Sequence, residues 1–348
     1  MTALAAAAGP ATLEDLIAAY LSGLWKKPVA VENLARIPGG ASRQTYRFDA
    51  VMGAERRGLI LRRDPVDSLI DTDRRIEYLA YQSFHPLGVP TPEPLVLDED
   101  GGVLERPFFL MSRIDGGAAA SPFTVDAYAP HAAEIGRQFF SILGTIAAAD
   151  PAPLPISRAA RAPMADACWS TELDHWEQEL DKDELHPNPI GRAAIRRLRR
   201  HPPPPAQKLS VVHGDYRSGN FMHDGQGRIL AILDWEMAHI GDPLEDLAWA
   251  IDPLWSHFDP TRVSGLLPRA EAIALWEASS GLTVDPAALQ WWELFNSFKG
   301  LVIWISAARS FRDGGGVDPV LGFTGLYCTR RHDQILAEKL EALLEAAA

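Results

Sequence analysis

A short stretch near the middle of the chain constrains its fold most strongly. Two apolar, strand-like segments there each end in an acidic residue, Asp215 and Asp234, and a carboxamide, Asn220, lies between them. Gly214 precedes the first acid and permits a sharp exit from its strand. Residues 224–227 are rich in turn formers and predict a hairpin that folds Asp234 back beside Asn220.

These three residue types suit phosphoryl transfer. Asp215, exposed to a cleft at a strand end, is able to accept a proton from a substrate hydroxyl. Asn220 and Asp234 offer one neutral and one charged oxygen, which suit Mg²⁺. Phosphoryl transfer needs little more, because positioning and metal charge stabilise its loose transition state. Any one of them alone would be explained as a turn residue or helix cap, whereas His213 is best explained as a hydrogen-bonding brace for the loop.

The segment resembles the catalytic loop of the aminoglycoside phosphotransferase family of small-molecule kinases. That loop has the form His-Gly-Asp, four residues, then Asn, with a later Asp before Trp, as residues 213–220 and 232–235 have here. Residues 216–220 resemble one branch in particular, the kinase domains found alone in bacteria or fused to acyl-CoA dehydrogenases in animals. The resemblance continues through residues 241–249 and implies that Asp246 holds the loop backbone and that Asp242 and Asp246 are both scaffolding residues.

The resemblance implies an α+β fold of two lobes that binds ATP and Mg²⁺. We expect a bilobal, protein-kinase-like chain with a small N-lobe of β-sheet plus helix and a larger, mainly helical C-lobe. The expected boundaries are a helical leader at 1–30, a nucleotide-binding N-lobe at 31–115, and a C-lobe with the catalytic loop and substrate pocket at 116–348.

Gly39, Gly40 and Ser42 are the candidate phosphate turn of the N-lobe. They lie between two strand-like segments, where small residues let backbone amides approach phosphates. Without the later motifs, a Gly-Gly pair between apolar segments would predict only a hairpin.

The next candidates contact the nucleotide from a strand and a helix. Residues 58–62 alternate as a strand that places Ile60 and Arg62 on one face, and Glu77 lies in the helical pattern that follows. The resemblance implies that Arg62 pairs with Glu77 and touches the α- and β-phosphates, where most kinases have Lys. Arg and Lys are not equivalent there. If Arg62 does not contact the phosphates, Arg63 is the next candidate for that role. The alternative for Arg62 and Arg63 together is a solvated basic pair at the end of a strand.

Residues 107–116 resemble the strand and interlobe hinge of the family. The resemblance implies that the main chain of Arg113 and Ile114 contacts adenine and that the Met111 side chain screens the pocket. The alternative for Met111 is a plain core residue.

The amino-acid composition indicates which classes of partner the protein binds and which cellular compartment suits it. The net charge of −13 argues against nucleic acid, whose binding needs clustered cations. Two cysteines, Cys168 and Cys328, are too few for a disulfide scaffold, which fits a reducing cytoplasm, and we expect both thiols to be inert. Residues 301–305 predict a buried helix, and no apolar run is long enough to span a membrane.

The acceptor is expected to be a small molecule with a hydroxyl group. The branch resemblance points to a hydroxyacyl-CoA or a related hydroxylated metabolite. An aminoglycoside or another antibiotic or sugar is the alternative, but residues 291–330, the segment expected to cover the pocket, contain no acidic run that would bind a polycation. A catalytically silent nucleotide-binding protein is the second alternative. Lys299 and Arg309 either bind an anionic acceptor or pair within the protein.

Overall fold

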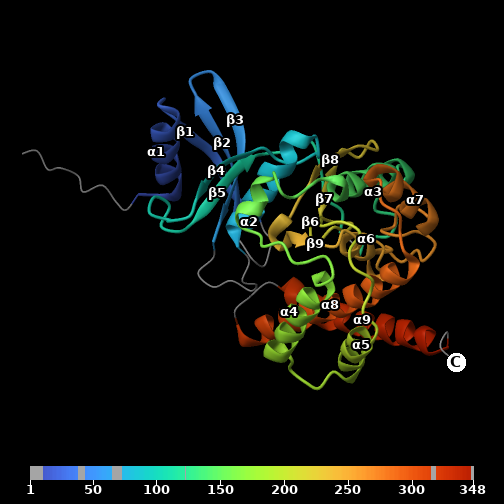
Figure 1. Ribbon diagram of the computed structural model, residues 1–348. Helices are drawn as coiled ribbons and strands as arrows, with labels where there is room; N and C mark the ends of the chain where they lie inside the picture. Colours follow the sequence, from blue (N-terminus) through green and yellow to red (C-terminus); the bar gives the residue numbers. More distant parts are fainter. Residues whose placement is uncertain (1–10, 38–43, 65–72, 122, 315–318, 346–348) are drawn as a thin grey trace, which may run out of the picture. The chain divides into compact units, whose positions relative to one another are not determined.

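The computed structural model describes residues 11–37, 44–64, 73–121, 123–314 and 319–345 (Figure 1). Its contacts divide the chain into two compact units. Unit 1 comprises Met1–Ser68 and Pro92–Ile114, and unit 2 comprises Leu69–Thr91 and Asp115–Ala348. The contacts therefore group the N-terminal helix with unit 1 and the helix that carries Glu77 with unit 2.

Unit 1 is a five-stranded antiparallel sheet with one helix on it. The strand order is β1-β2-β3-β5-β4. The elements are α1 (Leu13–Trp25), β1 (Ala30–Ile37), β2 (Gln44–Met52), β3 (Glu55–Arg63), β4 (Pro94–Asp98) and β5 (Phe108–Ser112). Ile17 and Leu21 of α1 pack with Leu59 and Leu61 of β3 in one apolar core. Alternate residues of β3 therefore point to the other face of the sheet.

A tight turn fixes the register of β2 and β3. Met52 pairs with Glu55, so the turn contains only Gly53 and Ala54, and Gly53 has φ +64°. Two-residue hairpin turns need such positive φ values, which glycine adopts without strain.

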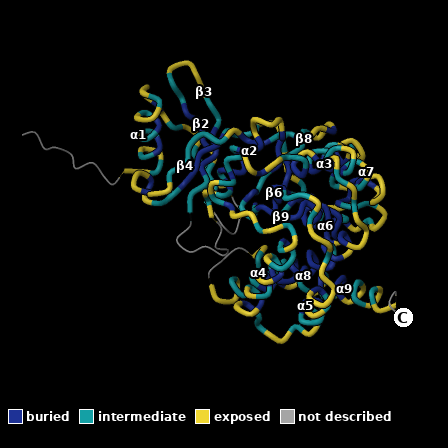
Figure 2. The backbone as a smooth tube through the Cα atoms, viewed as in Figure 1, coloured by how far each residue is buried: buried dark blue, intermediate teal, exposed yellow. Residues whose placement is uncertain are grey.

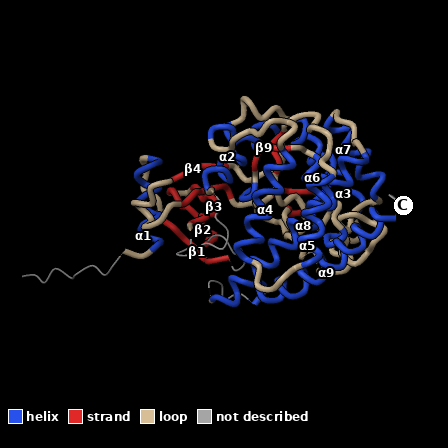
Figure 3. Tube along the Cα trace, turned by 60° about the horizontal axis from the view of Figure 1, so that its bottom comes forward, coloured by secondary structure: helices blue, strands red, loops and turns tan. Residues whose placement is uncertain are grey.

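Unit 2 is mainly helical, and most of its trace in Figure 3 is helix. Its α-helices are α2 (Arg74–Phe84), α3 (Ala132–Ala148), α4 (Cys168–Asp183), α5 (Pro189–Arg200), α6 (Leu244–Ala250), α7 (Arg269–Ser280), α8 (Pro286–Asp313) and α9 (Pro319–Glu345). Its short strands are β6 (Ser210–Val212), β7 (Phe221–His223), β8 (Ile229–Ile232) and β9 (His239–Gly241). Strand β6 pairs with β9 and β7 with β8, both antiparallel, so the predicted hairpin is confirmed.

Two helices form the core beneath the candidate site. Helix α8 contacts α4, α5, α6 and α9, and residues on all its sides are buried along its middle, as expected for a helix surrounded by others. The buried helix predicted at 301–305 is thus confirmed. Every residue of α6 is buried (Figure 2).

The α+β prediction is confirmed, with the five-stranded sheet in unit 1 and most helices in unit 2. Among the helices of the described ranges, none has the length and apolar character needed to cross a membrane. Cys168 and Cys328 are free and buried, and burial raises the pKa of each thiol to about 12. Both thiols are therefore protonated near neutral pH, which agrees with the expectation that they are inert.

Candidate active site

Gly214 shapes the loop that carries Asp215. The 213–220 loop begins where β6 ends, and Gly214 has φ +83°, in the left-handed region that favours glycine. A Cβ atom at this position would clash with the carbonyl oxygen of Met237. The predicted sharp exit from the strand is confirmed, and it requires glycine.

Asp246 of α6 holds the backbone of the loop. The N–H groups of His213 and Gly214 donate to its two carboxylate oxygens at 2.6 and 3.0 Å. Burial raises the pKa of Asp246 to about 7, although these hydrogen bonds oppose the rise. Asp242 instead accepts the Leu244 N–H of α6 at 3.0 Å and the Trp292 indole N–H of α8 at 3.0 Å. The predicted scaffolding role of both acids is confirmed.

His213 links the ends of the two strand-like segments. Its Nε2 donates to the carbonyl oxygen of Leu233 at 2.9 Å, and its Nδ1 accepts the Asp215 N–H at 3.2 Å. This pair of bonds assigns a neutral imidazole with its proton on Nε2. Burial lowers the pKa of His213 to about 4, which agrees with that assignment. The role of His213 as a brace is confirmed.

Three donors orient the carboxylate of Asp215, whose side chain is 16% exposed. Trp249 Nε1 and Arg217 Nε donate to Oδ1 at 2.8 and 3.0 Å, and Asn220 Nδ2 donates to Oδ2 at 2.6 Å. The Arg217 guanidinium also lies 4.7 Å from the ring centroid of Trp255. Sequence reasoning missed the Trp249 contact, because Trp249 lies 34 residues from Asp215 and fits the core pattern of α6.

The structure brings Asn220 and Asp234 to neighbouring positions. The Leu233 N–H donates to the Asn220 carbonyl oxygen at 2.8 Å, and Asp234 follows directly with φ +68°. Asn220 turns its amide nitrogen toward the main-chain oxygen of Asp215 at 2.9 Å. Its carboxamide oxygen is therefore the atom that remains for a cation, and with the Asp234 carboxylate it forms a set of hard oxygen donors.

The candidate nucleotide residues of unit 1 share one face of the sheet. Ile60 lies opposite Met111, and Arg62 lies opposite Phe109, across the β3–β5 ladder. Because directly opposed residues share a face, Ile60, Arg62 and Met111 lie on the face away from the α1 core. The predicted common face of Ile60 and Arg62 is confirmed, and the nucleotide contacts stay predictions.

Arg63 is held against its own sheet. Its guanidinium lies 5.8 Å from the ring centroid of Tyr46 and donates to Gln44 Oε1 at 3.0 Å and to the Leu104 carbonyl at 3.3 Å. These contacts favour a structural role for Arg63 over the fallback role in phosphate binding.

Arg113 continues the pairing of the strands. Its N–H donates to the carbonyl oxygen of Gly58 at 3.0 Å, and its side chain donates to Asp49 Oδ1 at 2.8 Å. An adenine contact from the main chain of Arg113 is therefore limited to its carbonyl oxygen. The main-chain contacts proposed for Arg113 and Ile114 stay predictions.

Three predicted residues, Gly39, Gly40 and Ser42, lie outside the described residues. Glu77 is fully buried on α2. Since Arg62 belongs to unit 1 and Glu77 to unit 2, their pairing also stays a prediction.

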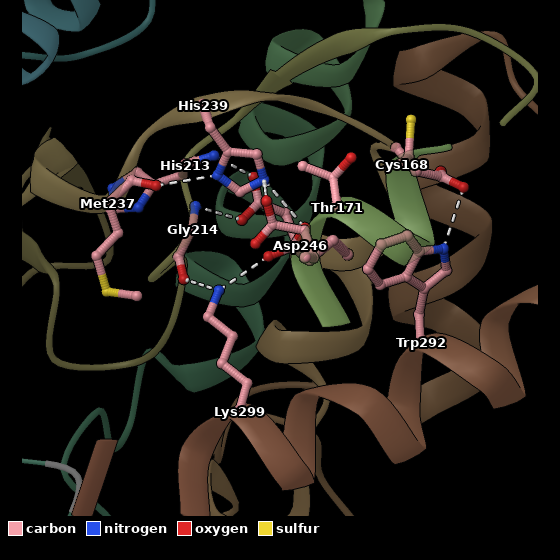
Figure 4. Close-up of polar contacts among 12 residues, drawn as sticks. Cys168, Thr171, His213, Gly214, Met237, His239, Asp246, Trp292 and Lys299 are labelled. Atoms are coloured by element: carbon pink, nitrogen blue, oxygen red, sulfur yellow. Dashed lines mark hydrogen bonds and ion pairs between the residues drawn. The ribbon is translucent and has the colours of Figure 1, made fainter. Parts of the chain in front are cut away.

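Unit 2 contains an open cavity of about 400 Å³ beside the 213–220 loop, hereafter the acidic cavity. Its charged lining residues are Asp73, Glu172, Glu179, Lys182, Asp183, Glu236 and Lys299, with His175 and His239. The cavity reaches the loop through Lys299, whose Nζ donates to the Gly214 carbonyl oxygen at 2.7 Å (Figure 4). It is therefore one candidate site for an acceptor.

The two cations considered for an anionic acceptor pair within the protein. Lys299 is 1% exposed and lies 2.9 Å from the Glu245 carboxylate. Arg309 lies 3.4 Å from the carboxylates of both Asp183 and Asp313. Lys299 and Arg309 therefore pair within the protein, which was one of the two alternatives for them. These two side chains therefore give no support to an anionic acceptor.

A cluster of opposite charges includes two residues that line the acidic cavity, Glu172 and His239, and the buried Glu245. His239 Nε2 lies 3.1 Å from Glu245 and 3.6 Å from Glu172. Burial alone would lower the pKa of His239, but the two carboxylates raise it to about 10. Ligand atoms of Glu172, His239 and Glu245 lie within 4.8 Å of one another. We assign no cation to them, because His239 and Lys299 already balance both carboxylates.

The charge of His239 predicts how stability depends on pH. Its folded-state pKa of about 10 exceeds the ordinary value of 6.5, so its stabilising contribution is full below pH 6.5 and is lost as the pH rises through 10. Relative to His239→Gln, the wild type should lose its advantage in unfolding free energy at up to about 1.4 kcal/mol per pH unit in this window. Urea unfolding of both proteins from pH 6.5 upward measures the difference, and a constant difference would contradict a charged His239.

Comparison with known proteins identifies the family. The model of the phosphotransferase enzyme family matches residues 33–282. Acyl-CoA dehydrogenase family member 11 of Gallus gallus is 26% identical over 262 residues, which cover 73% of this chain and 32% of that protein. Viomycin phosphotransferase of Streptomyces vinaceus is 33% identical over 172 residues, which cover 47% of this chain and 55% of that protein. The chain thus spans about a third of the first relative and about half of the second.

Solved structures show the same fold. A Ralstonia eutropha protein described as a candidate aminoglycoside phosphotransferase superposes with a TM-score of 0.74 at 19% identity, covering 94% of this chain and 98% of that one. A thermostable mutant of aminoglycoside phosphotransferase APH(4)-Ia, in a ternary complex with ADP and hygromycin B, gives a TM-score of 0.59 at 17% identity, covering 93% and 98%. The predicted kinase-like fold is confirmed, and the chain belongs to the phosphotransferase enzyme family, whose members are small-molecule kinases.

Proposed function

We propose that the protein transfers the γ-phosphoryl group of ATP to a hydroxyl group of a small molecule, with Asp215 accepting the hydroxyl proton. The observation that carries this proposal is the fixed orientation of the Asp215 carboxylate, which Trp249, Arg217 and Asn220 hold by hydrogen bonds of 2.6 to 3.0 Å. A general base must be held within hydrogen-bond reach of the proton that it abstracts. The buried support from Asp246 serves the same purpose.

Asn220 and Asp234 are the residues that we propose to hold Mg²⁺. Their donor set of one carboxamide oxygen and one carboxylate fits the preference of this cation for hard oxygen ligands. Bound Mg²⁺ would neutralise charge on the β- and γ-phosphates during transfer. The presence of ADP in the structure of APH(4)-Ia supports an adenine nucleotide as the phosphoryl donor.

We propose a hydroxyacyl-CoA or a related hydroxylated metabolite as the acceptor. Similarity to acyl-CoA dehydrogenase family members 10 and 11 supports it. A second cavity of about 360 Å³ in unit 2, hereafter the apolar cavity, also supports it. Its lining includes Phe123, Leu254 and Tyr327, and Leu254 adjoins Trp255, against which Arg217 lies. An acyl chain would therefore have apolar side chains to contact in this cavity.

A cationic acceptor, such as an aminoglycoside, is the second candidate. The acidic cavity favours it, because its lining carries five carboxylates, contributed by α4, the start of α2 and the turn after Asp234. None of the five belongs to residues 291–330, the segment in which the sequence shows no acidic run. The similarity to viomycin phosphotransferase also supports an antibiotic acceptor.

Replacing the proposed base should abolish transfer without abolishing nucleotide binding. We expect Asp215→Asn to lower kcat by about a hundredfold to ten-thousandfold, the usual effect of losing a general base, with little change in MgATP affinity. Asp224→Asn is the matched control, since Asp224 lies in the β7–β8 turn and accepts turn hydrogen bonds that Asn also accepts. Wild-type turnover by Asp215→Asn would remove Asp215 from the mechanism.

The two neighbouring arginines of β3 should differ in their effect on ATP. If Arg62 contacts phosphate, Arg62→Ala should raise the KM for ATP or lower kcat at least about tenfold, the loss expected for one charge-assisted hydrogen bond. Arg63→Ala should affect stability and leave ATP kinetics close to wild type, because Arg63 contacts Gln44 and Leu104. Steady-state kinetics at varied ATP concentrations measure both effects. A larger effect of Arg63→Ala than of Arg62→Ala would refute the assignment of Arg62 to phosphate.

A panel of acceptors separates the proposed substrates from one another. The protein is incubated with MgATP and hydroxyacyl-CoAs, free hydroxy acids, amino sugars or aminoglycosides, and mass spectrometry detects the added phosphoryl group. We expect product with the hydroxyacyl-CoAs. Phosphorylated product with aminoglycosides and none with acyl thioesters would refute the proposed hydroxyacyl-CoA acceptor but would support the proposed kinase activity. Binding of MgATP without transfer to any acceptor or to water would favour the silent alternative.

A further inference from the structure

Lys299 is a buried cation that binds a backbone carbonyl group of the 213–220 loop, whereas Asp246 binds backbone N–H groups of the same loop. It extends from α8, is 1% exposed, and donates to the Gly214 carbonyl oxygen at 2.7 Å (Figure 4). That carbonyl belongs to the peptide group that joins Gly214 to Asp215. The ammonium therefore contacts the main chain immediately before the proposed base.

Two adjacent acids of α6 hold the backbone of this loop, Asp246 directly and Glu245 through Lys299. Asp246 accepts the N–H groups of His213 and Gly214 directly. Glu245 acts through Lys299, because its carboxylate lies 2.9 Å from the ammonium that binds the Gly214 carbonyl oxygen. The donors and the acceptor of the loop backbone are thus both anchored to the same helix.

A second path joins Lys299 to the proposed base. Its Nζ lies 5.7 Å from the ring centroid of Trp249 and 5.6 Å from that of Trp176, within the range of cation–π contacts. Trp249 in turn donates its indole N–H to Asp215 Oδ1 at 2.8 Å. Lys299 therefore contacts both the main chain before Asp215 and the ring that orients its carboxylate.

The charges around Lys299 define the competing explanation. Glu245 and Glu172 are the acids that chiefly raise the pKa of Lys299 against the opposing effect of burial. Lys299 and His239 together lower the pKa of Glu245 to about 2, although burial alone would raise it. A residue that served only to neutralise Glu245 would have the same surroundings. Neutralisation of Glu245 would not require the contacts of Lys299 with Gly214 and Trp249, so these contacts favour a positioning role.

We propose that Lys299 is a positioning residue for phosphoryl transfer: it fixes the Gly214–Asp215 peptide and the Trp249 ring so that the Asp215 carboxylate meets the acceptor hydroxyl. The inference rests on the proposed function, in which Asp215 is the base. It assigns to Lys299 no contact with the nucleotide or the acceptor.

The decisive variant removes both charges of the buried pair. In Lys299→Met alone, Glu245 loses a counter-charge, and the fold itself is at risk. Lys299→Met combined with Glu245→Gln leaves no unpaired carboxylate at position 245, and the introduced carboxamide is still able to accept the His239 hydrogen bond. We expect this double variant to fold, to keep the wild-type KM for ATP, and to lose about tenfold to a hundredfold in kcat, as slight misplacement of a reacting group does.

Hydrogen exchange gives a readout that does not depend on the acceptor. In the double variant, peptides covering 213–220 should exchange about tenfold faster, the factor expected for the loss of one charge-assisted hydrogen bond. Lys339→Met combined with Asp252→Asn is the matched control, because it also removes both charges of an ion pair that involves a buried carboxylate of unit 2, and neither side chain bonds the 213–220 loop. It should leave both the exchange of the loop and kcat unchanged.

The outcomes separate this inference from the proposed function. If the double variant has wild-type kcat, or wild-type exchange in the loop, Lys299 only neutralises Glu245 and the inference is wrong. If the wild type transfers phosphate neither to water from MgATP alone nor to any acceptor of the panel, the proposed function fails. In that case, exchange in the loop still decides whether Lys299 holds it.

Discussion

The candidate site depends on one buried carboxylate that binds two consecutive backbone N–H groups. Asp246 on α6 accepts from His213 and Gly214, and both donors belong to a loop that makes a sharp exit from its strand. Without Asp246 those N–H groups would be buried and unsatisfied, at about 1–3 kcal/mol each. The orientation of Asp215 depends on this anchor. Trp249 and Asn220 donate hydrogen bonds to the Asp215 carboxylate, and the loop backbone that carries this carboxylate is already fixed.

Much of this arrangement was predictable from the sequence because it is local. The glycine at 214, the hairpin that returns Asp234 to Asn220, and the paired face of Ile60 and Arg62 all follow from short spacings and from the alternation of strand residues. The roles of Asp242 and Asp246 were predictable through family resemblance, which carries information about contacts between residues about thirty positions apart. The structure confirms these scaffolding contacts, with Asp246 bonded to the loop backbone and Asp242 bonded to Leu244 of α6.

The charged side chains of the helices were not predictable in the same way. Lys299 and Glu245 lie 54 residues apart, and nothing in either local sequence distinguishes a buried ion pair from a solvated charge. The same is true of the Trp249 contact with Asp215 and of the carboxylates around the acidic cavity. Which cations face a ligand depends on how helices pack, and helix periodicity alone does not determine that. The backbone of Arg113 was not predictable either. Its N–H bonds Gly58 and so extends the sheet, which leaves only its carbonyl oxygen for the predicted adenine contact.

The most direct test of the proposed mechanism is a crystal structure with Mg²⁺, a non-hydrolysable ATP analogue and the acceptor. We expect the acceptor hydroxyl about 2.6–3.2 Å from the Asp215 carboxylate, the distance required of a general base. We also expect the cation on oxygens of Asn220 and Asp234, with Lys299 still bonded to Gly214. A hydroxyl distant from Asp215, or a cation held by Glu172, His239 and Glu245 instead, would contradict the mechanism.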